Sequence, residues 1–279
     1  MLPGRYNAPF CDLIDSFYIS LENMAKLKGI YAMWYREYKV FLRERSRVVS
    51  SIVNPILWFV IIGGGLGSAI SISGVNYQTF IFPGVLIQSV LFSSIFFGVY
   101  IVWDKKIDFL KEVLVSPLSR RDIFIGKVLG GSTDTLIQMV ILLLIGLVFA
   151  SAGFMPGIRL DVFSVLVSLA FLLSTICAAV SIGLILGSQM ESPEGFQLVS
   201  SFVIFPMFFL SGALFPIDNL PPYLAPFVYL NPITYSVDGL RGMMIGKSAL
   251  PISMDYAIIT AFAALTILVG TYAFKKMKL

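Results

Sequence analysis

The sequence contains no histidine and few charged residues. Only 13% of its 279 residues are Asp, Glu, Lys or Arg, about half the charged share of a typical soluble domain. Without histidine, an HExxH metal site, a Ser-His-Asp triad and a His-dependent intramembrane protease site are all excluded. The apolar runs also lack paired carboxylates and metal-binding clusters. The sequence therefore does not predict an enzyme, a metal site or a cofactor site.

Cysteine is scarce as well, and no signal peptide is recognisable. Cys11 falls in a polar leader and Cys177 in an apolar run, so we expect different compartments and no disulfide framework. The first fifty residues hold eight Lys/Arg and no early apolar core. The first long apolar run is therefore expected to stay in the protein as an anchor.

Apolar residues, in contrast, are abundant. They make up 57% of the chain, and the mean hydropathy is +0.88. A water-soluble fold of this length cannot hide so much apolar surface, because its helices need polar faces toward solvent. A helix of roughly 20 residues spans the ~30 Å hydrocarbon core. The sequence predicts an all-α membrane protein with a cytoplasmic leader, 1–50, and a six-span domain, 51–279, with spans at about 51–70, 79–103, 132–150, 163–187, 198–215 and 256–274.

The basic residues set the predicted orientation. Seventeen of the 20 fall in the leader, in the connection between spans two and three, or in the tail. The exceptions are Arg159, Arg241 and Lys247. By the positive-inside rule, both termini are cytoplasmic in a multi-pass protein of the cell membrane. A five-span chain would leave its basic tail outside.

Within the leader, residues 27–47 show helical spacing. Leu27, Ile30, Tyr31, Trp34, Tyr38 and Phe41 share one face, and Arg36, Lys39, Arg43 and Arg47 the opposite one. Such a helix is suited to lie along the membrane, its aromatics among the headgroups and its basic face toward anionic lipid. The alternative is a helix docked on another domain. Residues 1–22 show no clear pattern.

The connection Asp104–Gly131 is too long and too patterned for a simple linker. Ile107, Leu110 and Leu114 form a short apolar stripe, and Ser116-Pro117 is expected to break the helix. Ser119 or Asp122 would cap the next helix, which leads into span three. The stripe fits either a partner's groove or the chain's own helix ends.

Four segments together resemble one protein family. They are REYKVFLRERSRVVSSIVNPILW, KEVLVSPLSRRDIFIGK, ESPEGFQLVSSFVIFPMFFLSGALFP and LNPITYSVDGLRGMM. They resemble the transmembrane permease subunit of type-2 ATP-binding-cassette (ABC-2 type) exporters, which include drug, lipid and polysaccharide exporters. The four segments follow one another in the order expected for that family and lie on the expected sides of the membrane. The matches run from about Tyr35 to Met244; residues 1–22 have no counterpart.

The resemblance implies a mechanism. Two permease copies, identical or different, would pair, and each would bind a separate cytoplasmic ATPase that uses ATP and Mg. A coupling helix, 106–115, would seat in that ATPase; its expected contact residues are Phe109, Leu110, Glu112, Leu114 and Arg120. For Glu112 and Arg120, simple solvation is the alternative. The chain itself has no GxxxxGK[ST] phosphate loop, and its Gly63–Gly67 cluster is interpreted as a packing or bending site. Membrane lipid is a further expected partner, and nucleic acid is not.

In this family, spans one, two and five line the path. The residues predicted for it here are Gln88, Ser89, Phe92, Ser93, Phe96, Phe202, Phe205 and Phe209. Aromatics with a few hydroxyls suit an amphipathic or lipid-like cargo. The alternative is that the Phe stripe faces lipid or packs in the bundle.

Asp134 stands near the cytoplasmic end of span three, where we expect it to reach interfacial water rather than to relay protons.

The leading function is the permease of an ATP-driven exporter of a hydrophobic drug or lipid-like compound. Polysaccharide or glycolipid export by the same machinery is the alternative. A self-sufficient channel or secondary transporter would need intramembrane ionisable groups or inverted repeats, and neither is clear. A pure scaffold would show no transport with an ATPase present.

Overall fold

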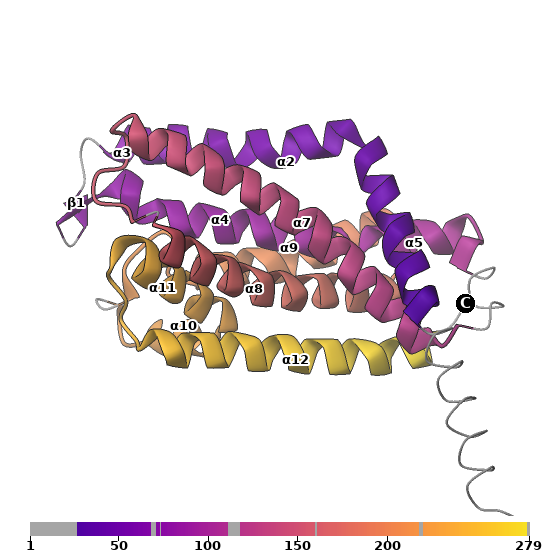
Figure 1. Cartoon of the computed structure of the whole chain (residues 1–279). Coiled ribbons are helices and arrows are strands. Elements are labelled where there is room, and N and C mark those ends of the chain that lie inside the picture. The colour runs from indigo at the N-terminus through magenta and orange to yellow at the C-terminus, as the bar shows by residue number, and fades with distance from the viewer. Residues whose placement is uncertain are drawn as a thin grey trace, which may run out of the picture.

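The structure is a bundle of long helices (Figure 1). It is a computed structural model that describes residues 27–67, 71–72, 74–110, 118–159, 161–217 and 220–277. An N-terminal helix, Leu27–Arg43, precedes the labelled elements. These are α2 (Arg45–Trp58), the π-helical turn η1 (Phe59–Gly63), α3 (Gly64–Gly67), β1 (Ser71–Ile72), β2 (Val75–Asn76), α4 (Tyr77–Phe96), α5 (Val99–Lys106), α7 (Arg120–Ser151), α8 (Val162–Gln189), α9 (Pro193–Phe209), α10 (Ala225–Leu230), α11 (Pro232–Ile245) and α12 (Ile252–Lys276).

The helical fold class is confirmed, and several helices are long enough to cross a membrane. By length and composition these are Tyr77–Lys106, which joins α4 and α5, and also α7, α8 and α12. The N-terminal helix and Val48–Gly63 qualify only as a pair bent by 68°, and α9 has 17 residues. The described residues thus provide four or five candidate spans, and the count of six stays a prediction. The only strands among them, β1 and β2, form a two-residue antiparallel pair.

Helix α8 lies at the centre, in contact with α4, α5, α7, α9, α11 and α12. Small residues allow the closest approach. A Cβ on Gly183 would lie 2.3 Å from the carbonyl oxygen of Ile95, and one on Gly187 2.2 Å from that of Gly98. Small residues spaced by four in membrane helices allow two helix backbones to pack against each other in this way.

Helix α11 is buried among α4, α8 and α12 rather than lying on the surface. Asp238 accepts hydrogen bonds from the backbone N–H groups of Ala249 and Leu250. Arg241 donates to the carbonyl of Gly212 and stacks over the ring of Phe80, with its Cζ 3.9 Å from the ring centroid. Asp238 thus holds the α11–α12 connection, and Arg241 ties the α9–α10 connection to α11.

Capping follows the sequence signals. Ser119 is the N-cap of α7 and accepts from the N–H of Asp122, which confirms one of the two predicted caps. Asp161 caps α8, and its hydrogen bonds from Ser164 hold the pKa of the Asp161 carboxyl below its usual value. The glycine cluster at the end of α2 does not break the helix: Gly63 lies in η1 against α4, and the helix continues into α3.

The beginning of the N-terminal helix and the end of α12 lie at the same end of the bundle (Figure 1). Arg120, at the start of α7, donates to the carbonyls of Lys275 and Met277 at the end of α12. Cys177 lies within α8, whereas Cys11 falls outside the described residues.

Candidate functional site

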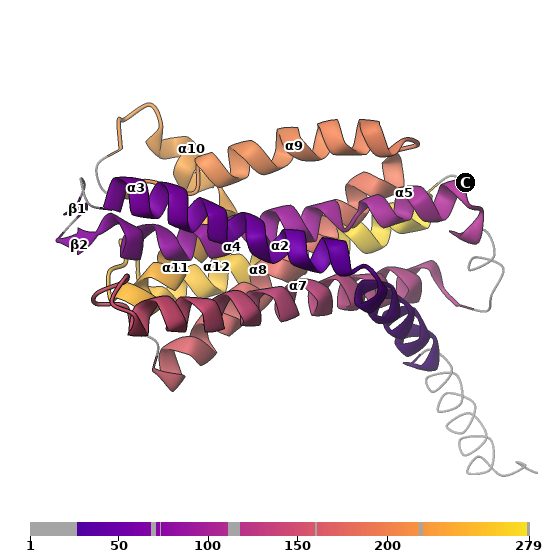
Figure 2. The ribbon, with the colours of Figure 1, turned by 90° about the horizontal axis from the view of Figure 1, so that it is seen from above.

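A groove runs between α2, α4 and α9 on one side of the bundle. Helix α4 packs against both α2 and α9, with α5 continuing at one end. In Figure 2, α2 crosses in front of α4, and α9 lies to one side of them. The space between them is a cavity of about 570 Å³. Its lining residues are Ser50, Ser51, Asn54, Pro55, Trp58, Gln88, Ser89, Phe92, Ser93, Phe96, Val99, Tyr100, Phe205, Phe208 and Phe209.

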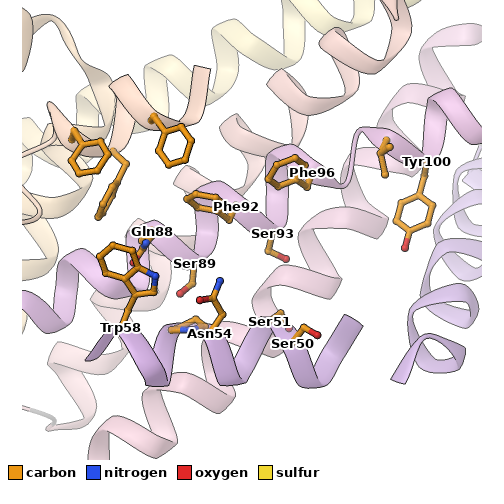
Figure 3. Close-up of a pocket in the computed structure, with 15 residues that line it drawn as sticks. Ser50, Ser51, Asn54, Trp58, Gln88, Ser89, Phe92, Ser93, Phe96 and Tyr100 are labelled. Atoms are coloured by element: carbon orange, nitrogen blue, oxygen red, sulfur yellow. The ribbon is translucent and has the colours of Figure 1, made fainter. Parts of the chain in front are cut away.

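The cavity has a polar part and an aromatic part. Serine and amide side chains from α2 and α4 approach one another on one side (Figure 3). Phenylalanines form the other side: Phe92 packs edge-on against Phe205 at 5.9 Å between centroids, and Phe205 stacks on Phe209 at 6.2 Å. The lining therefore matches a molecule with one polar and one apolar portion.

The structure gathers seven of the eight residues predicted for the path around this cavity. The exception is Phe202, which is 79% exposed on α9 and does not line it. The resemblance placed span one on the path without naming any of its residues, and the structure supplies Ser50, Ser51, Asn54, Pro55 and Trp58 of α2. The polar residues among them recur at a spacing of three to four in an otherwise apolar helix, a signal that was available in the sequence.

Behind the groove, polar side chains join α4 to α7. Ser93 donates to Oε1 of Gln138 at 2.8 Å, and Ser94 donates to the hydroxyl of Thr135 at 3.2 Å. Asp134, on the same stretch of α7, is only 1% exposed. The expectation that Asp134 reaches interfacial water is therefore wrong, because the packed helices cover it.

At the end of the bundle that carries both described termini, four charged side chains form a cluster in which Lys127, Glu37 and Asp104 are buried and Arg36 is half-buried. Lys127 on α7 lies 2.7 Å from a carboxylate oxygen of Asp104 on α5 and 2.9 Å from one of Glu37 on the N-terminal helix. Arg36 contacts the same two carboxylates at 2.8 Å. Two cations and two anions thus hold three segments together.

The N-terminal helix seats on α7 through small residues. A Cβ on Gly126 would lie 2.6 Å from that of Met33, and one on Gly130 2.5 Å from that of Glu37. The buried face of the helix is accordingly Met33, Glu37 and Phe41, and of the predicted aromatic stripe only Phe41 belongs to it. Tyr31 stays exposed and stacks with its neighbours, so an aromatic face toward lipid headgroups remains a prediction.

The residues expected to contact an ATPase have different surroundings. Leu110 is fully buried, Phe109 packs beneath Arg36 with the guanidinium 3.9 Å from the ring centroid, and Arg120 caps α12. Glu112 and Leu114 lie outside the described residues. Phe109, Leu110 and Arg120 thus make contacts within the chain, and their role toward an ATPase is still a prediction.

Comparison with known proteins covers most of the chain. The family described as ABC-2 type transporter matches residues 28–245. The inner membrane transport permease YadH of Escherichia coli strain K12 is 27% identical over 243 residues, which is 84% of this chain and 90% of YadH. Nodulation protein J of Rhizobium leguminosarum bv. viciae is 25% identical over 244 residues, covering 86% and 91% of the two chains. Nodulation protein J of Rhizobium meliloti strain 1021 is 24% identical, with 86% and 90% covered.

Proposed function

Because this chain belongs to the ABC-2 type transporter family, we propose that it is the membrane-spanning subunit of an ATP-driven exporter. The observation that carries the proposal is the groove between α2, α4 and α9. It provides a site for a molecule between apolar helices, and seven of the eight predicted path residues line it.

The energy source is a separate chain. The sequence contains no GxxxxGK[ST] phosphate loop, so ATP and Mg act on a partner ATPase. The connection between α5 and α7 contacts that partner. The helices at its two ends, α5 and α7, are joined by the charged cluster of Lys127, so a force on the connection reaches α5, α7 and the N-terminal helix together.

The proposed topology has six spans, with α2–η1–α3 as the first and α9 as the fifth. The 17 residues of α9 cover about 26 Å at ~1.5 Å per residue, which nearly spans the hydrocarbon core. Both termini are cytoplasmic. The exposed side chains of α9, such as Leu198 and Phe202, face a second permease copy or lipid.

The cargo is a hydrophobic or lipid-like compound with a polar portion. Aromatic side chains line one side of the cavity and uncharged polar groups the other, which fits an amphiphile. Inner membrane transport is what the name of YadH states for that protein, and the proposal extends it to this chain.

Co-purification from native membranes in mild detergent tests the proposal. The wild type is compared with a variant carrying Glu112→Ala and Leu114→Asp, and with a control, Val162→Ala, at an exposed position at the start of α8, beyond the opposite end of α7 from the connection. We expect an ATPase subunit with the wild type and the control, and its loss from the double variant. Absence of any ATPase from the wild type would contradict the exporter assignment.

A further inference from the structure

The serines of the groove have already donated their hydroxyl protons. Ser50 donates to the carbonyl of Ser46, Ser51 to that of Val48 and Ser89 to that of Val85, at 2.8, 2.9 and 2.8 Å respectively. Ser93 donates to the amide oxygen of Gln138. A hydroxyl group has one proton and two lone pairs, so each of these serines presents only an acceptor to the cavity.

The remaining lining groups do not reverse this excess of acceptors. Asn54 and Gln88 each add one amide oxygen and one amide nitrogen, and Trp58 adds one indole N–H. The hydroxyl of Tyr100 donates to the carboxylate of Glu44. Among the described side chains that line the cavity there is no Asp, Glu, Lys or Arg.

A lining rich in hydrogen-bond acceptors distinguishes head groups by the number of hydrogen-bond donors that they carry. A head group with O–H or N–H donors satisfies the serine oxygens. A head group with acceptors alone can pair with the N–H groups of Asn54, Gln88 and Trp58, but it leaves the serine oxygens unmatched, and unmatched polar groups cost free energy where they are shielded from water. An anion finds no cation in the lining, whereas an ammonium group also gains from the faces of Phe92, Phe96 and Phe205.

We propose that the groove selects amphiphiles whose polar head group donates hydrogen bonds and carries no negative charge. Hydroxylated and ammonium head groups share this chemistry. The inference rests on the proposed function for the role of the groove, but binding to it can be measured without an ATPase.

The experiment uses Trp58 as the reporter, because its side chain lines the cavity. The other two tryptophans, Trp34 and Trp103, are replaced by Phe, and the full chain is placed in nanodiscs of neutral lipid. Four probes share one hexadecyl chain: 1-O-hexadecylglycerol, its 2,3-dimethyl ether, hexadecylamine and hexadecyl phosphate. We expect the diol and the amine to change Trp58 fluorescence at concentrations about tenfold lower than the dimethyl ether and the phosphate.

A variant separates the hydrogen-bonding role of the serines from a structural one. Ser51→Ala with Ser89→Ala removes an acceptor from each of α2 and α4, and both hydroxyls bond only within their own helices. We expect this variant to bind the diol several-fold more weakly while its affinity for the dimethyl ether stays the same. Ser201→Ala is the matched control, since Ser201 makes the same bond to its own helix on an exposed face of α9 outside the cavity.

Equal binding of all four probes, tightest binding of the phosphate, absence of binding by any probe, or equal weakening of diol and ether in the double serine variant would each overturn the inference. The comparison between diol and amine tells which donor source is preferred. Selective binding without a co-purifying ATPase would refute the exporter function and leave the selectivity intact. An ATPase that co-purifies with the wild type, together with equal binding of all four probes, would refute the selectivity alone.

Discussion

The ammonium group of Lys127 lies 2.7 Å from Oδ2 of Asp104, and the lysine side chain is fully buried. Glu37 and Arg36 complete the cluster, so its formal charges cancel. Burial of an unpaired charge is costly, and the partly exposed Arg36 supplies the second positive charge that balances the buried Lys127, Glu37 and Asp104. The cluster joins the N-terminal helix, α5 and α7 at the end of the bundle next to the predicted coupling segment.

Replacement of Lys127 by Met is predicted to destabilise the protein strongly. The change leaves two buried carboxylates with one arginine, and the loss of one partner from a buried ion pair costs about 3–5 kcal/mol. Thermal unfolding in detergent, followed by tryptophan fluorescence, measures the effect. The exposed Lys106, which lies over the ring of Trp103, is the control, and Lys106→Met should change stability by less than about 0.5 kcal/mol.

A second change restores the charge balance. Lys127→Met combined with Glu37→Gln again gives one cation and one anion, so we expect part of the lost stability to return. A double variant that is less stable than Lys127→Met alone would show that packing, not charge, governs this site.

Substitution by alanine is predicted to lower the stability of the protein at Gly183 but not at Gly64. A Cβ on Gly183 would lie 2.3 Å from a backbone carbonyl oxygen that cannot move away freely, whereas a Cβ on Gly64 would meet nothing within 4 Å. Overpacking of this kind costs about 1–3 kcal/mol or more. Gly64→Ala should be neutral or stabilise by up to ~1 kcal/mol, since alanine favours helix. Equal melting temperatures for the two variants would contradict the close contact of α8 with the α4–α5 junction.

Alanine substitutions at Phe205 and Phe202 distinguish binding in the cavity from binding on the exposed face of α9. Phe205 lines the cavity and packs against Phe92, whereas Phe202 points away from the cavity. Phe205→Ala should weaken binding of hexadecylamine roughly tenfold, because an aromatic contact and its buried area are lost. Phe202→Ala should change it less than twofold. The fluorescence of Trp58 reports both, and a larger effect at Phe202 would place the binding site elsewhere.

The helices were predictable from hydropathy, and the groove only in part. Long apolar runs and basic flanks indicated the spans, and the Ser and Phe spacing in residues 88–96 indicated the α4 wall. The helix-capping role of Ser119 followed from its place before the apolar run. These features are local, so a single sequence carries them.

The charged cluster was not predictable in the same way. Glu37 lies between Arg36 and Lys39, which were assigned to a basic face toward anionic lipid. Only the docking of the N-terminal helix on Gly126 and Gly130 brings Glu37 to Lys127. Asp134 was misjudged for the same reason, since its burial depends on which helices surround α7. Contacts between segments distant in the chain decide these positions, and hydrophobic periodicity does not encode them.

The most direct test of the exporter account is transport itself. The chain and its co-purified ATPase are reconstituted into liposomes, and movement of a fluorescent amphiphilic amine is followed with and without ATP and Mg, beside the Leu114→Asp variant. The account predicts movement that requires ATP, the ATPase and Leu114. Movement by the chain alone, without an ATPase, would contradict it and point to a channel or secondary transporter.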